Sequence, residues 1–242
     1  KSAWAICFED TLNFIEWNFS HNYIPQNTII AEKDGTCASA MQLMPYKLNI
    51  GGEIFNARYV SGVCTLPKYR GYGLVREMFD FAHPKMYDMG ADISILIPAV
   101  DGMYEKFGYR ELAKRKLYKL DDISGFNVIC EFSDELILTL DEIYKKEMST
   151  KSMYISRCRF DWERILTDLL ILSGGRVLMS DGGYALAYPK NNSYEIWEIC
   201  GDIRLDVKTV PAPPVLAKII NTQKISEEIF RSSEDRYINM LL

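Results

Sequence analysis

The stretch TLPKYRGYGLVREMF, residues 65–79, joins an apolar run to an amphipathic one through a short basic, glycine-rich turn. Arg70, Gly71 and Gly73 lie at this joint. The N-terminus of a helix leaves backbone N–H groups unpaired, and glycines let an anion approach them without a Cβ in the way. Arg70 adds a permanent positive charge. The pattern predicts either a tight strand-to-helix turn or a site for a phosphate-bearing ligand.

Two familiar phosphate motifs do not fit this joint. A P-loop ends in Gly-Lys-Ser or Gly-Lys-Thr, and the chain has no such ending here. A dinucleotide fingerprint needs a third glycine three residues after Gly73, where Arg76 stands. The pattern that remains is R-x-x-G, from Arg70 to Gly73, after an apolar run.

Cysteine and histidine offer little further chemistry. The chain has six cysteines without a C-x-x-C pair and only two histidines, so we expect no metal site. Cys64 could accept an acyl group, but no base is close in sequence, and a buried strand cysteine is the favoured interpretation. Most of the cysteines lie in apolar runs, which predicts small buried side chains in a reducing compartment. They are Cys7, Cys37, Cys64, Cys130, Cys158 and Cys200.

The composition indicates a globular protein of one large or two ordinary domains. Of 242 residues, 48% are hydrophobic and 25% charged, with a formal net charge of −5. Without a basic patch or an apolar run of membrane-spanning length, we expect no nucleic-acid or membrane partner. The acidic balance suits a cationic small molecule, and we expect a cytoplasmic location. Because the chain opens at Lys1, we also expect a short N-terminal segment before it.

The elements that must hold the joint follow from local patterns. Turn signals at Asp34-Gly35 and Gly51-Gly52 separate apolar runs and predict hairpins. Apolar residues at helical spacing predict a helix from about Gly73 to Met89. The remaining predicted elements are a helix around residues 12–19, strands 28–31, 37–43, 54–65, 92–99 and 116–120, and a helical turn at 103–107.

After about Asp121 the order of elements repeats. Two helices, residues 133–147 and 161–172, precede three strands at 177–179, 184–188 and 194–200, separated by Asp-Gly and Asn-Asn turns. The first unit continues into PKYRGYG, whereas the second continues into GDIRLDV without glycines at that joint. We therefore predict two related units, residues 1–120 and 121–207, followed by a linker and a partly helical tail over 208–242.

The first unit resembles the coenzyme A-binding core of the GNAT acetyltransferase superfamily. The similarity is carried by VSGVCTLPKYRGYGLVREMF, by the strand GADISILIPA and by YEKFGY, in the order of that family, and it spans Trp4 to about Leu120. The two-unit layout and MQLMPY are similar to the enhanced-intracellular-survival type, which carries tandem GNAT units. The resemblance implies an α/β fold with a mixed sheet, the GNAT acyl-CoA N-acyltransferase fold, and a second, degenerate GNAT-like unit.

The same resemblance implies roles for named residues. The strand backbone of Val63, Cys64 and Thr65 would pair with the pantetheine arm of acetyl-CoA, and Tyr104 would be the general acid that protonates the departing thiolate. The pyrophosphate would be held at the joint by Arg70 and the backbone amides of Gly71, Tyr72, Gly73, Leu74, Val75 and Arg76.

These features predict an N-acetyltransferase that moves acetyl from acetyl-CoA, as co-substrate, to a primary amine. By analogy with the subtype, the amine would be a polyamine, an aminoglycoside-like compound or an exposed lysine. Two alternatives stay open, namely a coenzyme-binding module without catalysis and the transfer of a longer acyl group. The general base is not assigned among Asp101, Glu105 and the terminal carboxylate of Leu242. A homo-oligomer is also left open.

Overall fold

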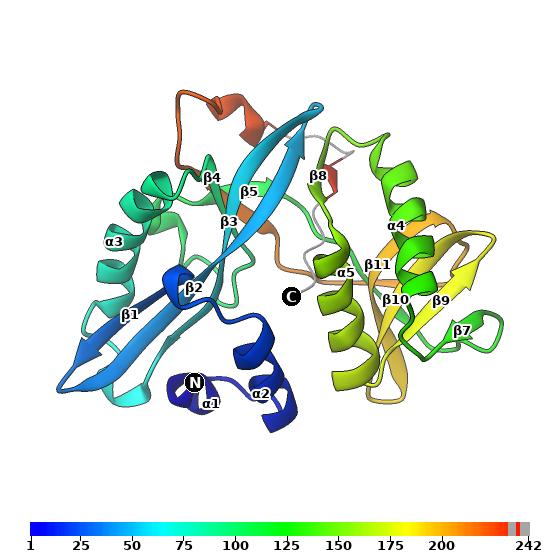
Figure 1. Ribbon diagram of the computed structural model, residues 1–242, viewed down its shortest axis with the longest axis horizontal. Helices are drawn as coiled ribbons and strands as arrows, with labels where there is room; N and C mark the ends of the chain where they lie inside the picture. The colour runs from blue at the N-terminus through cyan, green and yellow to red at the C-terminus, as the bar shows by residue number, and fades with distance from the viewer. Residues whose placement is uncertain (232–235, 238–242) are drawn as a thin grey trace. The chain divides into compact units, whose positions relative to one another are not determined.

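The structure is a computed structural model that describes residues 1–231 and 236–237 (Figure 1). The chain divides into two compact units. The first consists of Lys1–Leu48, Ile54–Leu112 and Val215–Ser232, and the second of Asn49–Glu53, Ala113–Pro214 and Ser233–Leu242.

The first unit contains three helices, six strands and short 3₁₀ turns among the residues described. The helices are α1 (Ser2–Cys7), α2 (Leu12–His21) and α3 (Leu74–Asp88). The strands are β1 (Thr28–Lys33), β2 (Thr36–Ile50), β3 (Glu53–Thr65), β4 (Ile93–Leu96), β5 (Arg110–Ala113) and β13 (Val215–Ile219). The 3₁₀ turns are η1 (Pro25–Asn27), η2 (Pro67–Tyr69), η3 (Glu105–Phe107) and η5 (Glu227–Phe230).

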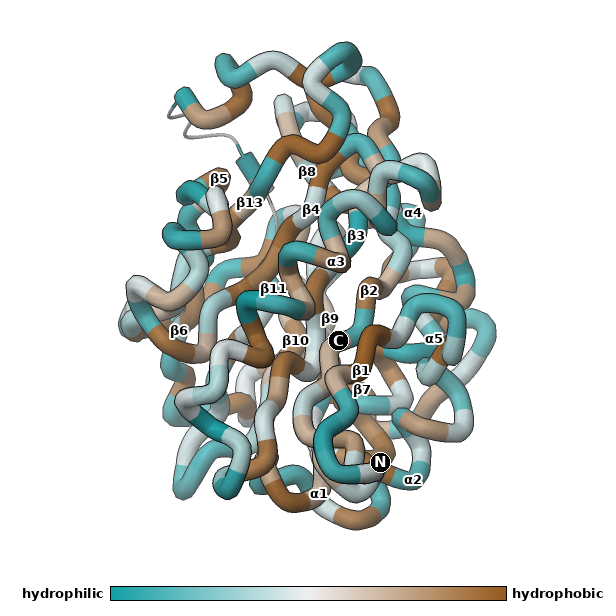
Figure 2. The backbone as a smooth tube through the Cα atoms, turned by 90° about the vertical axis from the view of Figure 1, so that its left-hand side faces the viewer, coloured by the Kyte–Doolittle hydropathy of each residue, from teal (hydrophilic) through white to brown (hydrophobic). Residues whose placement is uncertain are grey.

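The strands of the first unit form a mixed sheet in the order β1-β2-β3-β4-β13-β5. β1 and β2 pair antiparallel, β3 and β4 pair parallel, and β13 pairs antiparallel with β4. Side chains of a strand alternate between the two faces of its sheet. Met41 and Leu43 of β2 accordingly pack with α3, whereas Ala38 and Ala40 pack with α1. All four residues of β4 are buried, and Figure 2 colours this strand mainly as hydrophobic.

β13 is a strand within the segment predicted as a linker and a partly helical tail, and the 3₁₀ turn η5 follows it. Val215, Leu216 and Ala217 are buried, and the strand joins the first unit's sheet between β4 and β5. The run VLAKI has only five residues, which is too short for periodicity to separate a strand from a helix. Its partner Ile93 lies far away in sequence, so no local pattern indicates the pairing.

The second unit carries its own six-stranded sheet, in the order β12-β6-β11-β10-β9-β7. The two turns predicted in its meander are found, and Asn191 has a φ of 55° at the second of them. β6 pairs with β11 and β12, which places residues 117–120 in the second sheet rather than with the first unit. Its elements are β6 (Leu117–Leu120), β7 (Asn127–Ile129), α4 (Asp134–Met148), β8 (Met153–Ser156), α5 (Arg159–Leu166), the π-helix η4 (Thr167–Leu172), β9 (Arg176–Ser180), β10 (Gly182–Lys190), β11 (Ser193–Asp202), β12 (Lys208–Val210) and β14 (Arg236–Tyr237).

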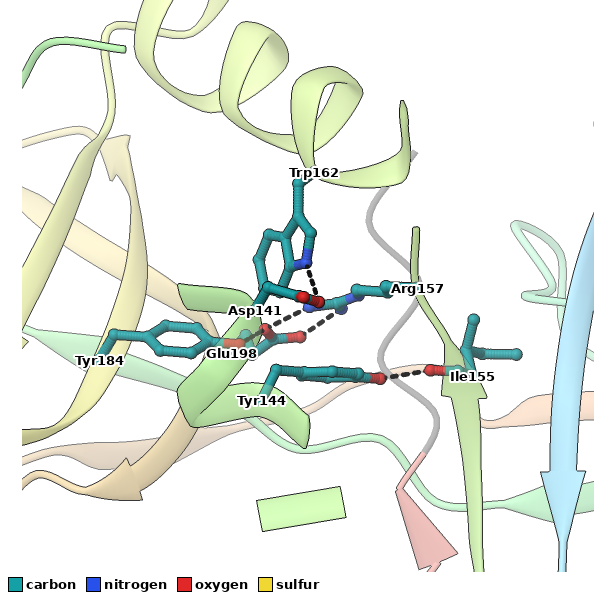
Figure 3. Close-up of polar contacts among 7 residues, drawn as sticks. All are labelled: Asp141, Tyr144, Ile155, Arg157, Trp162, Tyr184 and Glu198. Carbon is teal, nitrogen blue, oxygen red and sulfur yellow. Dashed lines mark hydrogen bonds and ion pairs between the residues drawn. The ribbon is translucent and has the colours of Figure 1, made fainter. Parts of the chain in front are cut away.

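A buried ion pair lies in the core of the second unit (Figure 3). Arg157 donates from both terminal nitrogens to the carboxylate of Glu198, at 2.7 and 2.6 Å. The guanidinium lies between the rings of Tyr144 and Trp162, 4.2 and 4.7 Å from their centroids. The hydroxyl of Tyr184 donates to the same carboxylate at 2.6 Å. The two charges are therefore paired and hydrogen-bonded, as burial requires.

Candidate active site

The glycine joint opens α3 as a bare helix N-terminus. Gly71 and Gly73 have φ values of +83° and +82°, which favour glycine, and Gly73 is the N-cap of α3. A Cβ at either position would meet no atom within 4 Å, so the space before the helix is open. The carbonyl of Gly73 accepts from Arg76 N at 2.9 Å and from Glu77 N at 3.2 Å. The amides that precede Arg76 are thus the ones that the helix leaves for a ligand.

β3 contains a bulge just before this joint. Val60 and Val63 both pack in the cluster beneath α3, although residues three apart in a regular strand face opposite sides. One extra residue must therefore lie between them, and Gly62 has a φ of +60°. A Cβ on Gly62 would lie 2.2 Å from Cζ3 of Trp4 in α1. The bulge is thus a place where only glycine fits under the indole ring.

The end of β3 directs backbone groups toward both of its edges. Leu66 N donates to Ala38 O of β2 at 2.9 Å, and Ser39 Oγ donates to Cys64 O at 2.6 Å. Alternate residues of a strand point their N–H and C=O groups to opposite edges, so Val63 and Thr65 face away from β2. On that side, within the part of the chain that the structure describes, β4 pairs with Ala57–Tyr59 and not with the last residues of β3. β3 thus diverges from β4 and leaves the edge of its last residues facing the joint.

Several cationic side chains lie around the joint. Arg70 Nε donates to Thr65 O at 3.2 Å, which ties the turn to the end of β3. The guanidinium of Arg76 lies 5.6 Å from the ring centroid of Phe107, and Lys33 Nζ lies 3.8 Å from that of Tyr72. These groups supply positive charge next to unpaired amides, as an anion site requires.

The burial of the cysteine side chains differs from the prediction. Cys64 and Cys200 are buried, but Cys130 and Cys158 are exposed, so the expectation that most are buried is wrong. Burial of each cysteine depends on its contacts in the folded chain more than on the hydropathy of the flanking residues. Burial raises the pKa of Cys64 to about 12, with Cys7 adding to the effect. The Cys64 thiol therefore stays protonated at neutral pH and is a poor nucleophile.

Tyr104 lies at the entrance of the 3₁₀ turn η3 and is only 6% exposed. Its ring meets Phe79 of α3 edge-on, with 5.9 Å between the centroids. Its carbonyl accepts from Phe107 N at 3.0 Å and from Tyr109 N at 3.4 Å, which closes the turn. Burial raises the pKa of Tyr104, so the phenol carries its proton at neutral pH.

The buried cluster beneath α3 brings three of the predicted site residues together. Tyr104 is one of its members, and Val63 and Val75 pack against it. Asp101 and Glu105 are exposed beside Tyr104. Leu242, proposed from the resemblance as a base, lies outside the residues that the structure describes. Sequence reasoning missed Gly62, although an isolated glycine in an apolar strand indicates a bulge.

A comparison with models of protein families shows which family the residues of this site match. A model of the acetyltransferase (GNAT) domain matches residues 1–112. Residues 1–112, just under half of the chain, are similar to a GNAT acetyltransferase domain. The resemblance seen in the motif is thereby confirmed. The bulged strand, the open glycine joint and the Tyr104 turn all lie within the matched GNAT domain.

Solved structures share the fold over most of the chain. A GCN5-related N-acetyltransferase from Anabaena variabilis has a TM-score of 0.71 at 14% identity, over 91% of this chain and 69% of that one. One from Kribbella flavida has 0.66 at 10%, over 87% and 64%. Eis1 from Mycobacterium abscessus has 0.62 at 12%, over 87% and 71%. The predicted fold class, a GNAT fold with a second GNAT-like unit, is confirmed, and the chain spans about two thirds of the length of these proteins.

No curated protein matches the sequence significantly. Within residues 1–231 and 236–237, no group of three or more His, Cys, Asp or Glu side chains could hold a metal ion. In the same part of the chain, no helix is both long and apolar enough to cross a membrane.

Proposed function

We propose that the chain is an N-acetyltransferase that moves acetyl from acetyl-CoA to a primary amine by direct attack in a ternary complex. The observation that carries the proposal is the open N-terminus of α3, with Gly71 and Gly73 at positive φ and free space before them. The pyrophosphate would accept from the amides of residues 71–75, with Arg70 beside them. The backbone of Val63 and the amide of Thr65 would pair with the pantetheine arm, whereas the carbonyl of Thr65 already accepts from Arg70 Nε.

The amine must lose its proton before it attacks the acyl carbon. An alkyl ammonium with a pKa of about 10 requires about 4 kcal/mol for deprotonation at neutral pH. A base or a chain of waters takes up this proton before attack, and it takes up a second proton from the same nitrogen as the amide forms. The amine nitrogen then bonds to the thioester carbon, the C–S bond breaks, and the electron pair leaves with the coenzyme sulfur.

Tyr104 would return a proton to that sulfur. Its phenol is kept protonated by burial, and its ring is fixed by Phe79 and by the turn that follows. Proton transfer from Tyr104 to the thiolate would give free coenzyme A and tyrosinate, which solvent reprotonates. No covalent acyl-enzyme is needed, in keeping with the buried, protonated thiol of Cys64.

Replacing Gly73 with glutamate should abolish acetyl-CoA binding. The new carboxylate would fill the open space before α3 and repel the pyrophosphate. Isothermal titration calorimetry with acetyl-CoA would measure the loss, with Gly90→Glu as the matched control. Gly90 lies just past the other end of α3, also with a positive φ of +72° and open space. Unchanged affinity in Gly73→Glu would contradict the phosphate site.

Tyr104→Phe should lower kcat on the order of 10²-fold while leaving acetyl-CoA affinity within about twofold, because only the proton donor is lost. A thiol-release assay over a panel of amines would measure turnover, and Tyr87→Phe on the exposed side of α3 is the control. Coenzyme binding without turnover in the parent protein would favour the alternative of a non-catalytic coenzyme-binding module.

A further inference from the structure

Lys218 of β13 contacts the turn that carries Tyr104. Its ammonium donates to the carbonyl oxygen of Phe107 at 2.8 Å. The same Nζ lies 3.2 Å from Nδ1 of His83 in α3. The two partners are 111 and 135 positions away in sequence. One side chain therefore links β13, α3 and the turn.

The turn is also closed by hydrogen bonds within its own backbone. Phe107 N and Tyr109 N both donate back to Tyr104 O, and Gly108 N donates to Glu105 O. Gly108 has a φ of +87°, and a Cβ there would lie 3.2 Å from Lys218 Nζ. Lys218 thus bonds to the carbonyl at the end of η3, directly where the backbone turns left-handed.

His83 is held in one protonation state by its surroundings. Burial and the charge of Lys218 lower its pKa to about 4, while Asp80 opposes the shift. The His83 ring also packs against Phe79 and Tyr109, 5.5 and 5.8 Å between centroids. At neutral pH its Nδ1 therefore accepts from the ammonium. Since two acceptors share Lys218, the position of its Nζ is fixed.

We propose that Lys218 is a positioning residue for Tyr104, and this inference rests on the proposed function. The Lys218 ammonium fixes the carbonyl of Phe107, and the ring of Phe107 stacks on Phe79 with 4.6 Å between centroids. Phe79 is also the ring against which Tyr104 packs. Loss of the ammonium leaves the Phe107 end of η3 less restrained. The Tyr104 phenol at the other end is then no longer held in one orientation.

Turnover in a double-mutant cycle tests the inference. Lys218→Met keeps the apolar stem and should lower kcat about tenfold or more, with acetyl-CoA affinity within about twofold. In the Tyr104→Phe background the same change should have little further effect, because the group being positioned is already gone. Lys218→Arg keeps a charged donor and should recover most of the activity. Lys224→Met is the control. Lys224 lies on the same segment as Lys218, and its replacement removes an ion pair to Asp92.

A readout independent of activity separates this inference from the proposed function. A fluorine label on the ring of Tyr104 should give one ¹⁹F resonance in the parent protein and in Lys224→Met. It should broaden or split in Lys218→Met. An unchanged resonance in Lys218→Met, or additive losses of kcat in the cycle, would overturn the role of Lys218. Absent turnover in the parent protein would count against the proposed function, and the resonance would still decide on Lys218. If Lys218→Met does not fold, Lys218→Gln carries the same comparison.

Discussion

Replacing Glu198 with leucine should lower the free energy of unfolding by about 3–5 kcal/mol, because it removes the buried carboxylate that pairs with the Arg157 guanidinium. Both side chains are almost fully buried, at 3% and 0% exposed. The carboxylate accepts two hydrogen bonds from Arg157 and one from Tyr184 (Figure 3). All three donors would lose this acceptor at once. Urea denaturation followed by circular dichroism would measure the change.

The double variant Arg157→Leu/Glu198→Leu should recover most of this loss, since apolar residues of similar size often replace a buried ion pair at little cost. Glu163→Leu is the matched control in the same unit, because Glu163 pairs with Arg159 on the surface at 40% and 54% exposure. Its cost should stay below about 1 kcal/mol. Similar losses in Glu163→Leu and Glu198→Leu would contradict the importance of burial.

Gly62→Ala should destabilise the first unit and weaken acetyl-CoA binding. The left-handed backbone alone costs an alanine roughly 1–2 kcal/mol. The new Cβ would lie 2.2 Å from the Trp4 ring, and such overpacking adds about 1–3 kcal/mol. The ring has little room to move, since it packs against Phe8 and Phe19 and donates from Nε1 to Asp10. Denaturation and calorimetry would measure the two effects.

Two variants separate the causes of that loss. Gly35→Ala has a similar φ of +68° in open space, so it should show the backbone cost alone. Trp4→Ala in the Gly62→Ala background should restore the part caused by the clash. If Gly62→Ala costs no more than Gly35→Ala, the contact with Trp4 does not shape the bulge.

Features that depend on neighbouring residues could be predicted from the sequence. The turns at Asp34-Gly35 and Gly51-Gly52 need positive φ at consecutive positions, and the structure shows it at all four residues. The helix predicted from Gly73 to Met89 was found at Leu74–Asp88 because its apolar spacing is long and regular. The Gly73 joint also depends on local geometry, which is why its shape could be inferred before any contact was known.

Features that depend on distant residues could not be predicted. β13 and β5 are short, and their pairing is set by strands elsewhere in the chain. The contact of Trp4 with Gly62 joins a helix to a strand, and no spacing in the sequence indicates it. Tyr104 was selected among 15 tyrosines only through its place in YEKFGY. No local pattern in the sequence indicates a role for Lys218, because its partners lie more than a hundred positions upstream.

The placement of β13 has a consequence for synthesis on the ribosome. Translation delivers β4 and β5 long before residues 215–219, and the longest segment of the second unit, Ala113–Pro214, emerges in between. Until then the nascent first unit exposes the backbone edge of β4, which another polypeptide could pair with. Covering the edge of β4 with β13 requires contacts between residues far apart in sequence, and such contacts form slowly. The sheet of the first unit is therefore completed only after residues 215–219 have been translated.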